Sequence, residues 1–284
     1  MKAATAPPDD ARDRVLDFEA TPLDPYLQTF SAHTLPPGAV RSGDDAPYAI
    51  VLQRVTVRPE KIWHYQLFMV NAWRPWLHRA GVRMLAGASY LTGEPGVVLN
   101  VWRVPRALTL ADDAMPPELV AHYRDELVLR EETETLTPAR YDPERVLERG
   151  AAPASGDLFA PAKRVYLIDT IGVAPGCMTR FAVGKQRLMR PLLEDAAMGA
   201  PPGRGWFLVC GGWRGRGGAA SAVNVWSLPD LGALTEAMMR LAENTAYQRF
   251  VRATVTGEDQ YLLHPMSLYD PRSARVDGRV VYAW

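Results

Sequence analysis

The stretch VVLNVWRV at residues 97–104 decides the fold, because its centre, Asn100-Val101-Trp102, returns as Asn224-Val225-Trp226 within AASAVNVWSL at residues 219–228. Other pairs follow in the same order at a nearly constant offset. They are Pro59 and Pro175, Arg74-Pro75 and Arg190-Pro191, Ala107-Leu-Thr109 and Ala233-Leu-Thr235, and Tyr123 and Tyr247. A collinear series of this kind indicates an internal duplication.

Each copy is predicted to contain four strands and two helices in the order β-α-β-β-α-β. In the first copy, β-branched runs predict strands at 48–57, 82–91, 97–104 and 132–136, and apolar residues at helical spacing predict helices at 60–79 and 108–130. In the second copy, strands are predicted at 164–173, 205–213, 220–228 and 260–264, and helices at 178–197 and 230–252. Pro75 predicts a kink or a break within the first helix.

This order is that of a ferredoxin-like α+β unit, in which both helices cover one face of an antiparallel sheet. The other face is apolar and must be covered. Two copies in one chain can cover it by packing sheet to sheet, which predicts a pseudo-dimeric α+β barrel with its helices outside. The predicted domains are an irregular lead-in at 1–46, a first repeat at 47–143, a linker at 144–162 and a second repeat at 163–284, with a C-terminal tail.

The composition predicts a cytoplasmic protein that binds neither nucleic acid nor a membrane surface. Basic and acidic residues number 32 each, so the chain has no basic excess. No apolar run has the length of a membrane span, and the first residues do not resemble a signal peptide. Only four of the basic residues are lysines, which with abundant Ala, Gly and Pro indicates a GC-rich bacterial genome. The duplication closes the barrel within one chain and still permits a homodimer.

The second copy resembles the dimeric α+β barrel superfamily, and within it the NIPSNAP-like and EthD-like proteins. The resemblance rests on Pro175-Gly176 before the first helix, Gly205-Trp206 at the second strand, Asn224-Val225-Trp226, and the segment at 246–250. The first copy departs from this pattern with Pro59-Glu60 and with Met115-Pro116-Pro117. The resemblance implies a cavity between the repeats for a hydrophobic small molecule, such as a polyketide-like metabolite of natural product biosynthesis. It implies a cofactor-independent cyclase, isomerase, dehydratase or monooxygenase, or alternatively a haem-binding enzyme.

No strong catalytic motif is present, so candidate residues come from polar positions inside apolar elements. Asp169 and Arg54 each interrupt a predicted strand, and a desolvated Asp169 could act as a general base. His64 on the first helix could act as an acid or base. Either His64 or His122 could act as a haem ligand. No spacing of His, Cys, Asp and Glu indicates a metal site.

Candidate substrate-binding residues share faces of the predicted strands and helices. Alternation places Asn100 with Trp102, and Asn224 with Trp226, so each pair could hold a substrate carbonyl or enolate. The alternative is that duplication copied a packing motif. The remaining candidates for the cavity are Tyr90, Trp63 and Tyr247. The sequence therefore favours an enzyme and leaves two alternatives open, a haem protein and a non-catalytic binding or interaction module.

Overall fold

The computed structural model describes residues 46–91, 96–106, 116–143, 165–193, 206–214, 220–266, 270, 275–276 and 279–280. The predicted lead-in at 1–46, apart from Ala46, and the linker at 144–162 lie outside the described residues. The glycine-rich tip at 215–218 also lies outside them. Among the described residues, no helix is long and apolar enough to cross a membrane.

Eight of the described strands form one closed antiparallel barrel. They are β1 (Tyr48–Val57), β2 (Arg83–Tyr90), β3 (Val97–Pro105), β4 (Val128–Pro138), β5 (Val165–Val173), β6 (Phe207–Arg214), β7 (Ala220–Leu228) and β8 (Val255–Pro265). Around the barrel they follow the order β1-β3-β2-β8-β5-β7-β6-β4. The first four strands are thus ordered β4-β1-β3-β2 and the last four β8-β5-β7-β6, which is the same arrangement. Two seams, β2–β8 and β4–β6, join the halves.

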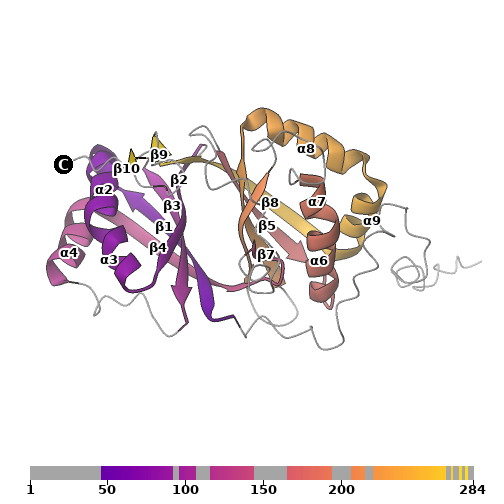
Figure 1. Cartoon of the computed structure of the whole chain (residues 1–284), viewed down its shortest axis with the longest axis horizontal. Coiled ribbons are helices and arrows are strands. Elements are labelled where there is room, and N and C mark those ends of the chain that lie inside the picture. Colours follow the sequence, from indigo (N-terminus) through magenta and orange to yellow (C-terminus); the bar gives the residue numbers. More distant parts are fainter. Residues whose placement is uncertain are drawn as a thin grey trace, which may run out of the picture.

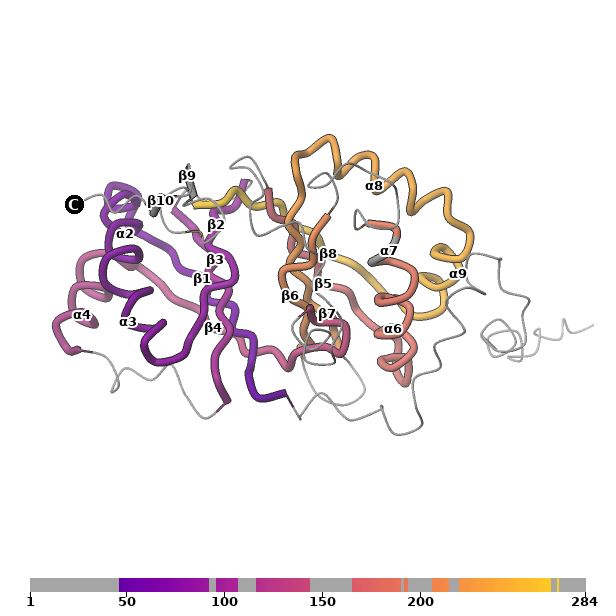
Figure 2. The backbone as a smooth tube through the Cα atoms, in the orientation of Figure 1, coloured from indigo at the N-terminus to yellow at the C-terminus, as the bar shows by residue number. Residues whose placement is uncertain are grey.

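The helices lie outside the barrel. They are α2 (Ile62–Phe68), α3 (Arg74–Arg79) and α4 (Pro117–Ala121) in the first half, and α6 (Met178–Gly184), α7 (Arg190–Leu193), α8 (Leu231–Glu243) and α9 (Thr245–Thr254) in the second. Figure 1 shows them at the two outer sides, with the strands between them, and the tube in Figure 2 shows the same layering. The predicted α+β class and antiparallel barrel are confirmed. A short pair, β9 (Arg275–Val276) and β10 (Arg279–Val280), follows the barrel.

Three clusters of buried side chains make up the core, and strand alternation decides which cluster each residue joins. Ile50 and Leu52 point into the barrel and pack with Ile168, Val225 and other residues of both halves. The odd-numbered residues of β1 point outward instead and pack beneath the helices of the first half. A third cluster lies beneath the helices of the second half. The molecule therefore has one shared core inside the barrel and a separate core under each helical layer.

Two aspartates join the halves by reciprocal hydrogen bonds. Asp142, which follows β4, accepts from the Tyr48 hydroxyl at 2.7 Å and from the backbone N–H of Gly211 in β6 at 3.0 Å. Asp270, which follows β8, accepts from the Tyr166 hydroxyl at 2.8 Å and from the backbone N–H of Gly87 in β2 at 3.0 Å. Both carboxylates are fully buried. Each half thus supplies a buried acceptor to a strand of the other.

Several predicted boundaries were wrong near the second helix of each half. The helix predicted to reach residue 130 ends at Leu127, and β4 begins at Val128 rather than at 132. In the second half the helix predicted at 230–252 is divided by Asn244, whose side chain caps α9 by accepting from the Tyr247 N–H, and β8 begins at Val255. After their first residues, Val128 and Val255, both strands carry a run of mostly polar, exposed residues that pair with only one neighbouring strand. The apolar alternation that marks a buried strand is therefore absent there.

The break expected at Pro75 takes the form of a wider helical turn. Residues Met69–Trp73 form a π-helical segment, η4, in which the Arg74 N–H bonds to the Met69 carbonyl. The α-helical geometry resumes at Arg74, so Pro75 lies in the first turn of α3, where its missing N–H costs little. The second half has the same device, a π-helical segment, η8, at Lys185–Met189 before α7.

Candidate functional site

Most of the polar residues expected to line a cavity between the repeats face the other way, whereas Arg54 and Tyr90 lie on the barrel side of their strands. Gln53, Asn100 and Trp102 belong to the side of the sheet that packs under the helices of the first half. Asp169, Asn224 and Trp226 occupy the same side in the second half. The alternation argument grouped these residues correctly on shared faces, but both faces of these strands are apolar and buried. Periodicity alone could not decide which face was the interior.

In the first half these side chains form a neutral hydrogen-bonded cluster. The Gln53 Oε1 atom accepts from Asn100 Nδ2 at 3.1 Å and from Trp102 Nε1 at 2.8 Å. Gln53 Nε2 donates to the Tyr123 hydroxyl at 3.3 Å, and Asn100 Nδ2 donates to the Tyr65 hydroxyl at 2.8 Å. All five residues are buried. These five side chains are themselves uncharged, and the exposed carboxylate of Glu131 borders them, accepting from Gln53 Nε2 at 2.8 Å.

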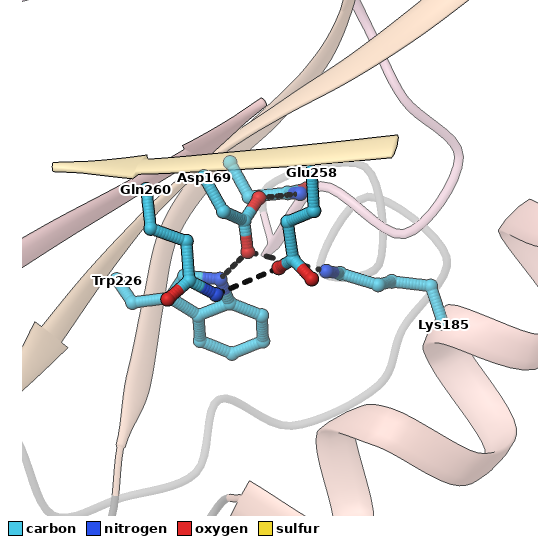
Figure 3. Close-up of polar contacts among 6 residues, drawn as sticks. Asp169, Lys185, Trp226, Glu258 and Gln260 are labelled. Carbon is cyan, nitrogen blue, oxygen red and sulfur yellow. Dashed lines mark hydrogen bonds and ion pairs between the residues drawn. The ribbon is translucent and has the colours of Figure 1, made fainter. Parts of the chain in front are cut away.

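In the second half Asp169 takes the place of Gln53, and the cluster becomes charged. Gln53 pairs in register with Asn100, and Asp169 pairs in the same way with Asn224. The Asp169 carboxylate accepts a short hydrogen bond from Asn224 Nδ2 and one from Trp226 Nε1 at 2.9 Å. The Lys185 Nζ atom lies 3.5 Å from Asp169 Oδ2. Figure 3 draws this ion pair as a dashed line. Both members of this ion pair are buried, at 1% and 0% side-chain exposure.

Lys185 reaches this position from the helical layer. It is the first residue of η8, directly after α6, and its ammonium group lies over the rings of Trp226 at 5.2 Å and Phe181 at 5.8 Å. Burial lowers the pKa of the Lys185 amine, while Asp169 and then Glu258 act in the opposite direction. The outcome is an enclosed amine that gives up its proton more readily than a lysine in water.

Exposed polar residues of β8 border the ion pair. The Glu258 carboxylate accepts from Gln260 Nε2 at 2.7 Å, and both side chains belong to exposed residues. Figure 3 shows Glu258 beside the line joining Asp169 to Lys185. Burial, Glu258 and Asp169 together raise the pKa of Tyr247, which therefore stays a neutral hydrogen-bond donor. The exposed side chains of Glu258 and Gln260 thus lie next to the buried pair.

The halves differ where the charges lie. Met69 is the first residue of η4, as Lys185 is of η8, so a thioether occupies the place of the amine. With Gln53 in place of Asp169, neither charge has a counterpart in the first half. The same architecture is therefore compatible with a neutral pair, and the fold does not require the ion pair.

The other predicted site residues lie apart from this cluster. His64 and Trp63 are exposed on α2. Arg54 is exposed on the side of β1 opposite to Gln53, and its guanidinium lies 5.4 Å from the ring centroid of Tyr90 near the β2–β8 seam. Of the predicted residues, the structure thus brings together Asp169, Asn224 and Trp226, with Tyr247 beside them, and separately Asn100 with Trp102, and Arg54 with Tyr90.

The described histidines do not fit a haem-binding position. An axial ligand needs a ring nitrogen directed into an enclosed space. His64 is exposed, and His122 is a surface residue whose Nδ1 atom lies 3.2 Å from Glu126. His264 is exposed, with its Nδ1 atom 2.8 Å from the Pro265 carbonyl oxygen. Within the described part of the chain, no group of three or more His, Cys, Asp and Glu side chains could hold a metal ion.

Sequence reasoning missed Lys185, although a signal was present. The residue follows Phe181 and precedes Leu188 in the apolar row of its helix, and it is one of only four lysines in the chain. A charge inside an apolar helical face needs a buried partner. Asp169, a charged residue inside a predicted strand, could be the partner of Lys185, but only the tertiary structure shows that the two side chains meet.

Comparison with known proteins gives similarity in fold. No family model and no curated protein matches the chain. A candidate monooxygenase from Lactobacillus acidophilus has a TM-score of 0.50 at 9% identity over 77% of this chain and 93% of its own. A second candidate monooxygenase, from Fusobacterium nucleatum, has a TM-score of 0.48 at 10% identity over 78% and 93%. A NIPSNAP-like domain protein from Burkholderia xenovorans has a TM-score of 0.29 at 18% identity over 37% and 88%.

The barrel topology and the likeness to the Lactobacillus acidophilus structure show the fold. The chain has the fold of the dimeric α+β barrel superfamily, with both halves of the barrel in one polypeptide.

Proposed function

We propose that the protein is a small-molecule enzyme that moves a proton on a hydrophobic, carbonyl-containing substrate at the Asp169–Lys185 cluster. Proton transfer next to a carbonyl group is common to cyclisation, isomerisation and dehydration, and it needs no metal or haem. The proposal keeps three of the four reaction classes that the resemblance implies, those of a cyclase, an isomerase and a dehydratase, and does not include the monooxygenase. It moves the site from the space between the repeats to the space beneath the helices of the second half.

The buried ion pair is the observation that carries the proposal. Removing two charges from water costs several kcal/mol per ion, and a well-packed neutral pair is often at least as stable. The first half has the neutral residues Gln53 and Met69 at the same positions, and the carboxylate that Gln53 contacts there, Glu131, is exposed. Retaining a fully buried ion pair in one half only is typical of a functional site, where burial and a specific partner tune a titratable group.

Each polar group has a separate role in this scheme. The Lys185 amine acts as the base, because its lowered pKa provides the free amine closer to neutral pH. Asp169 positions that amine, since its oxygens are already occupied by Asn224, Trp226 and Lys185. This replaces the role of general base suggested for Asp169. The neutral Tyr247 hydroxyl donates to the substrate oxygen as negative charge develops there.

Solvent-exchange measurements test the proposal without knowledge of the natural substrate. In D2O, we expect the wild-type protein to accelerate the loss of α-proton NMR signals from 2-tetralone, a hydrophobic bicyclic ketone. The double variant Asp169→Gln/Lys185→Met, which copies the neutral pair of the first half, should lose this acceleration. Lys61→Met, which removes a lysine outside the cluster, should retain it. An exchange rate in the double variant equal to that of wild type would exclude the cluster as the site.

A non-catalytic binding or interaction module is the second candidate. It is favoured by the packing inside the barrel, where side chains of both halves form one buried cluster. In this case hydrophobic ligands would raise the melting temperature of wild type, while 2-tetralone exchange would stay at the rate of buffer. The cytoplasmic location, the homodimer and the duplication origin of the two halves stay predictions.

A further inference from the structure

Lys185 combines three features that are rarely found together on a lysine. Its side chain is fully buried, its ammonium group lies against two aromatic rings, and its nearest anion is held by two other donors. The Asp169 carboxylate is therefore fixed in place and does not follow the amine. A fixed anion beside this enclosed amine would stabilise a positive charge on Nζ both in the ammonium ion and after Nζ has formed a bond to carbon.

We propose that Lys185 forms an imine with aldehydes and ketones, so that the cluster binds its carbonyl substrate covalently. The proposal deepens the proposed function and rests on it, because it assigns the substrate class and the first step at the same site. The rings of Trp226 and Phe181, which now contact the ammonium group, would flank the apolar part of the bound ketone.

The step balances without an added oxidant or reductant. The lone pair of the neutral Nζ atom attacks the carbonyl carbon, and the π electrons of the C=O bond move to oxygen. That oxygen takes up one proton from nitrogen, which gives a neutral carbinolamine. It then takes up a second proton from solvent and leaves as water, while the nitrogen lone pair forms the C=N bond. The product is the protonated imine, which keeps the remaining N–H proton, and this cation replaces the ammonium group beside Asp169.

The open edge of β8 provides the route to the amine. Glu258 and Gln260 are exposed and bonded to each other, and Glu258 lies close enough to Lys185 to affect its pKa. The rings of Trp226 and Phe181 contact the amine, whereas Glu258 is the exposed side chain beside the pair. A substrate would therefore enter past Glu258, with its carbonyl group leading.

Reductive trapping tests this inference directly. The full-length protein is incubated with 2-tetralone and sodium cyanoborohydride, which reduces an imine to a stable secondary amine, and the label is located by peptide mass spectrometry. Lys2, Lys61 and Lys163 serve as internal controls in the same molecule. We expect Lys185 to be labelled at least about tenfold faster than Lys61 near neutral pH, because burial lowers the pKa of the Lys185 amine and so increases its fraction of free amine.

The outcomes separate the imine from the proposed function. Preferential labelling of Lys185 supports the imine. Labelling confined to the other lysines, or spread equally over all four, overturns it. If wild type accelerates 2-tetralone exchange but Lys185 remains unlabelled, the imine is wrong and acid–base catalysis stands. If neither exchange nor labelling occurs, both proposals fail. The wild-type protein is used throughout, so the result does not depend on whether a variant folds.

Discussion

Two residues distinguish the second half from the first at the level of single side chains. Asp169 and Lys185 form a buried ion pair where Gln53 and Met69 are neutral. Breaking such a pair by removing one partner leaves an uncompensated buried charge, which is costly. Replacing both partners with apolar or neutral groups of similar volume is often neutral or stabilising. We therefore expect the effects of substitutions at positions 169 and 185 on the free energy of unfolding to be strongly coupled.

We expect Lys185→Met alone to lower the free energy of unfolding by about 3–5 kcal/mol, because Asp169 would lose its cation. Adding Asp169→Gln should restore most of that loss, since the double variant reproduces the combination already present in the first half. Urea denaturation followed by tryptophan fluorescence measures all three proteins. A double variant no more stable than the single one would contradict the idea that the fold does not require the ion pair.

At the scale of elements, the packing of α6 against α9 depends on a glycine. A Cβ atom added to Gly184 would lie 2.2 Å from Cε2 of Phe250, much closer than a contact allows. The Phe250 ring is buried and lies 5.7 Å from that of Phe181, so it has little freedom to move. Gly184 therefore sets the close approach of the two helices directly beside Lys185.

We expect Gly184→Ala to destabilise the protein by about 1–3 kcal/mol through overpacking, despite the better helix propensity of alanine. Gly257→Ala is the matched control, because a Cβ atom there meets nothing within 4 Å. Thermal unfolding by circular dichroism compares the two. Combining Gly184→Ala with Phe250→Leu should recover part of the lost stability. Equal stability of Gly184→Ala and Gly257→Ala would show that the contact between Gly184 and Phe250 does not limit the packing.

At the scale of the whole molecule, the two aspartates hold the halves together. Asp142 and Asp270 each accept from a tyrosine of their own half and from a backbone N–H of the opposite half. The barrel interior is also shared between the halves. We therefore expect the halves to unfold together in one transition rather than as separate domains.

We expect Asp142→Ala and Asp270→Ala to lower the free energy of unfolding by a similar amount, about 2–5 kcal/mol each, because each leaves two buried donors without that acceptor. Asp230→Ala, which removes only the N-cap of α8 at an exposed helix end, should cost about 1 kcal/mol. Urea titrations of the three variants make the comparison. A loss in Asp142→Ala no greater than in Asp230→Ala would show that the reciprocal hydrogen bonds contribute little to joining the halves.

Much of the fold can be predicted from sequence because buried strands have a strong local signature. The β-branched runs at 48–57 and 220–228 match β1 and β7 at both ends. The strands β4 and β8 were predicted too short, since most residues in their first halves are polar and exposed and lack the apolar alternation of a buried strand. For the candidate site, polar positions inside strands pointed to Asp169, Asn224 and Trp226. Lys185 did not stand out, because its partner is distant in sequence.

The sequence alone determined the order of elements, the barrel class and the positions where polar groups interrupt apolar strands. These features follow from local propensity and from periodicity, which any segment carries by itself. Only the tertiary structure decided which face of each strand looks into the barrel, that Lys185 meets Asp169, and that Asp142 and Asp270 cross between the halves. Both faces of the central strands are buried, so their hydrophobic pattern is symmetric. The choice between faces depends on contacts among segments far apart in the chain.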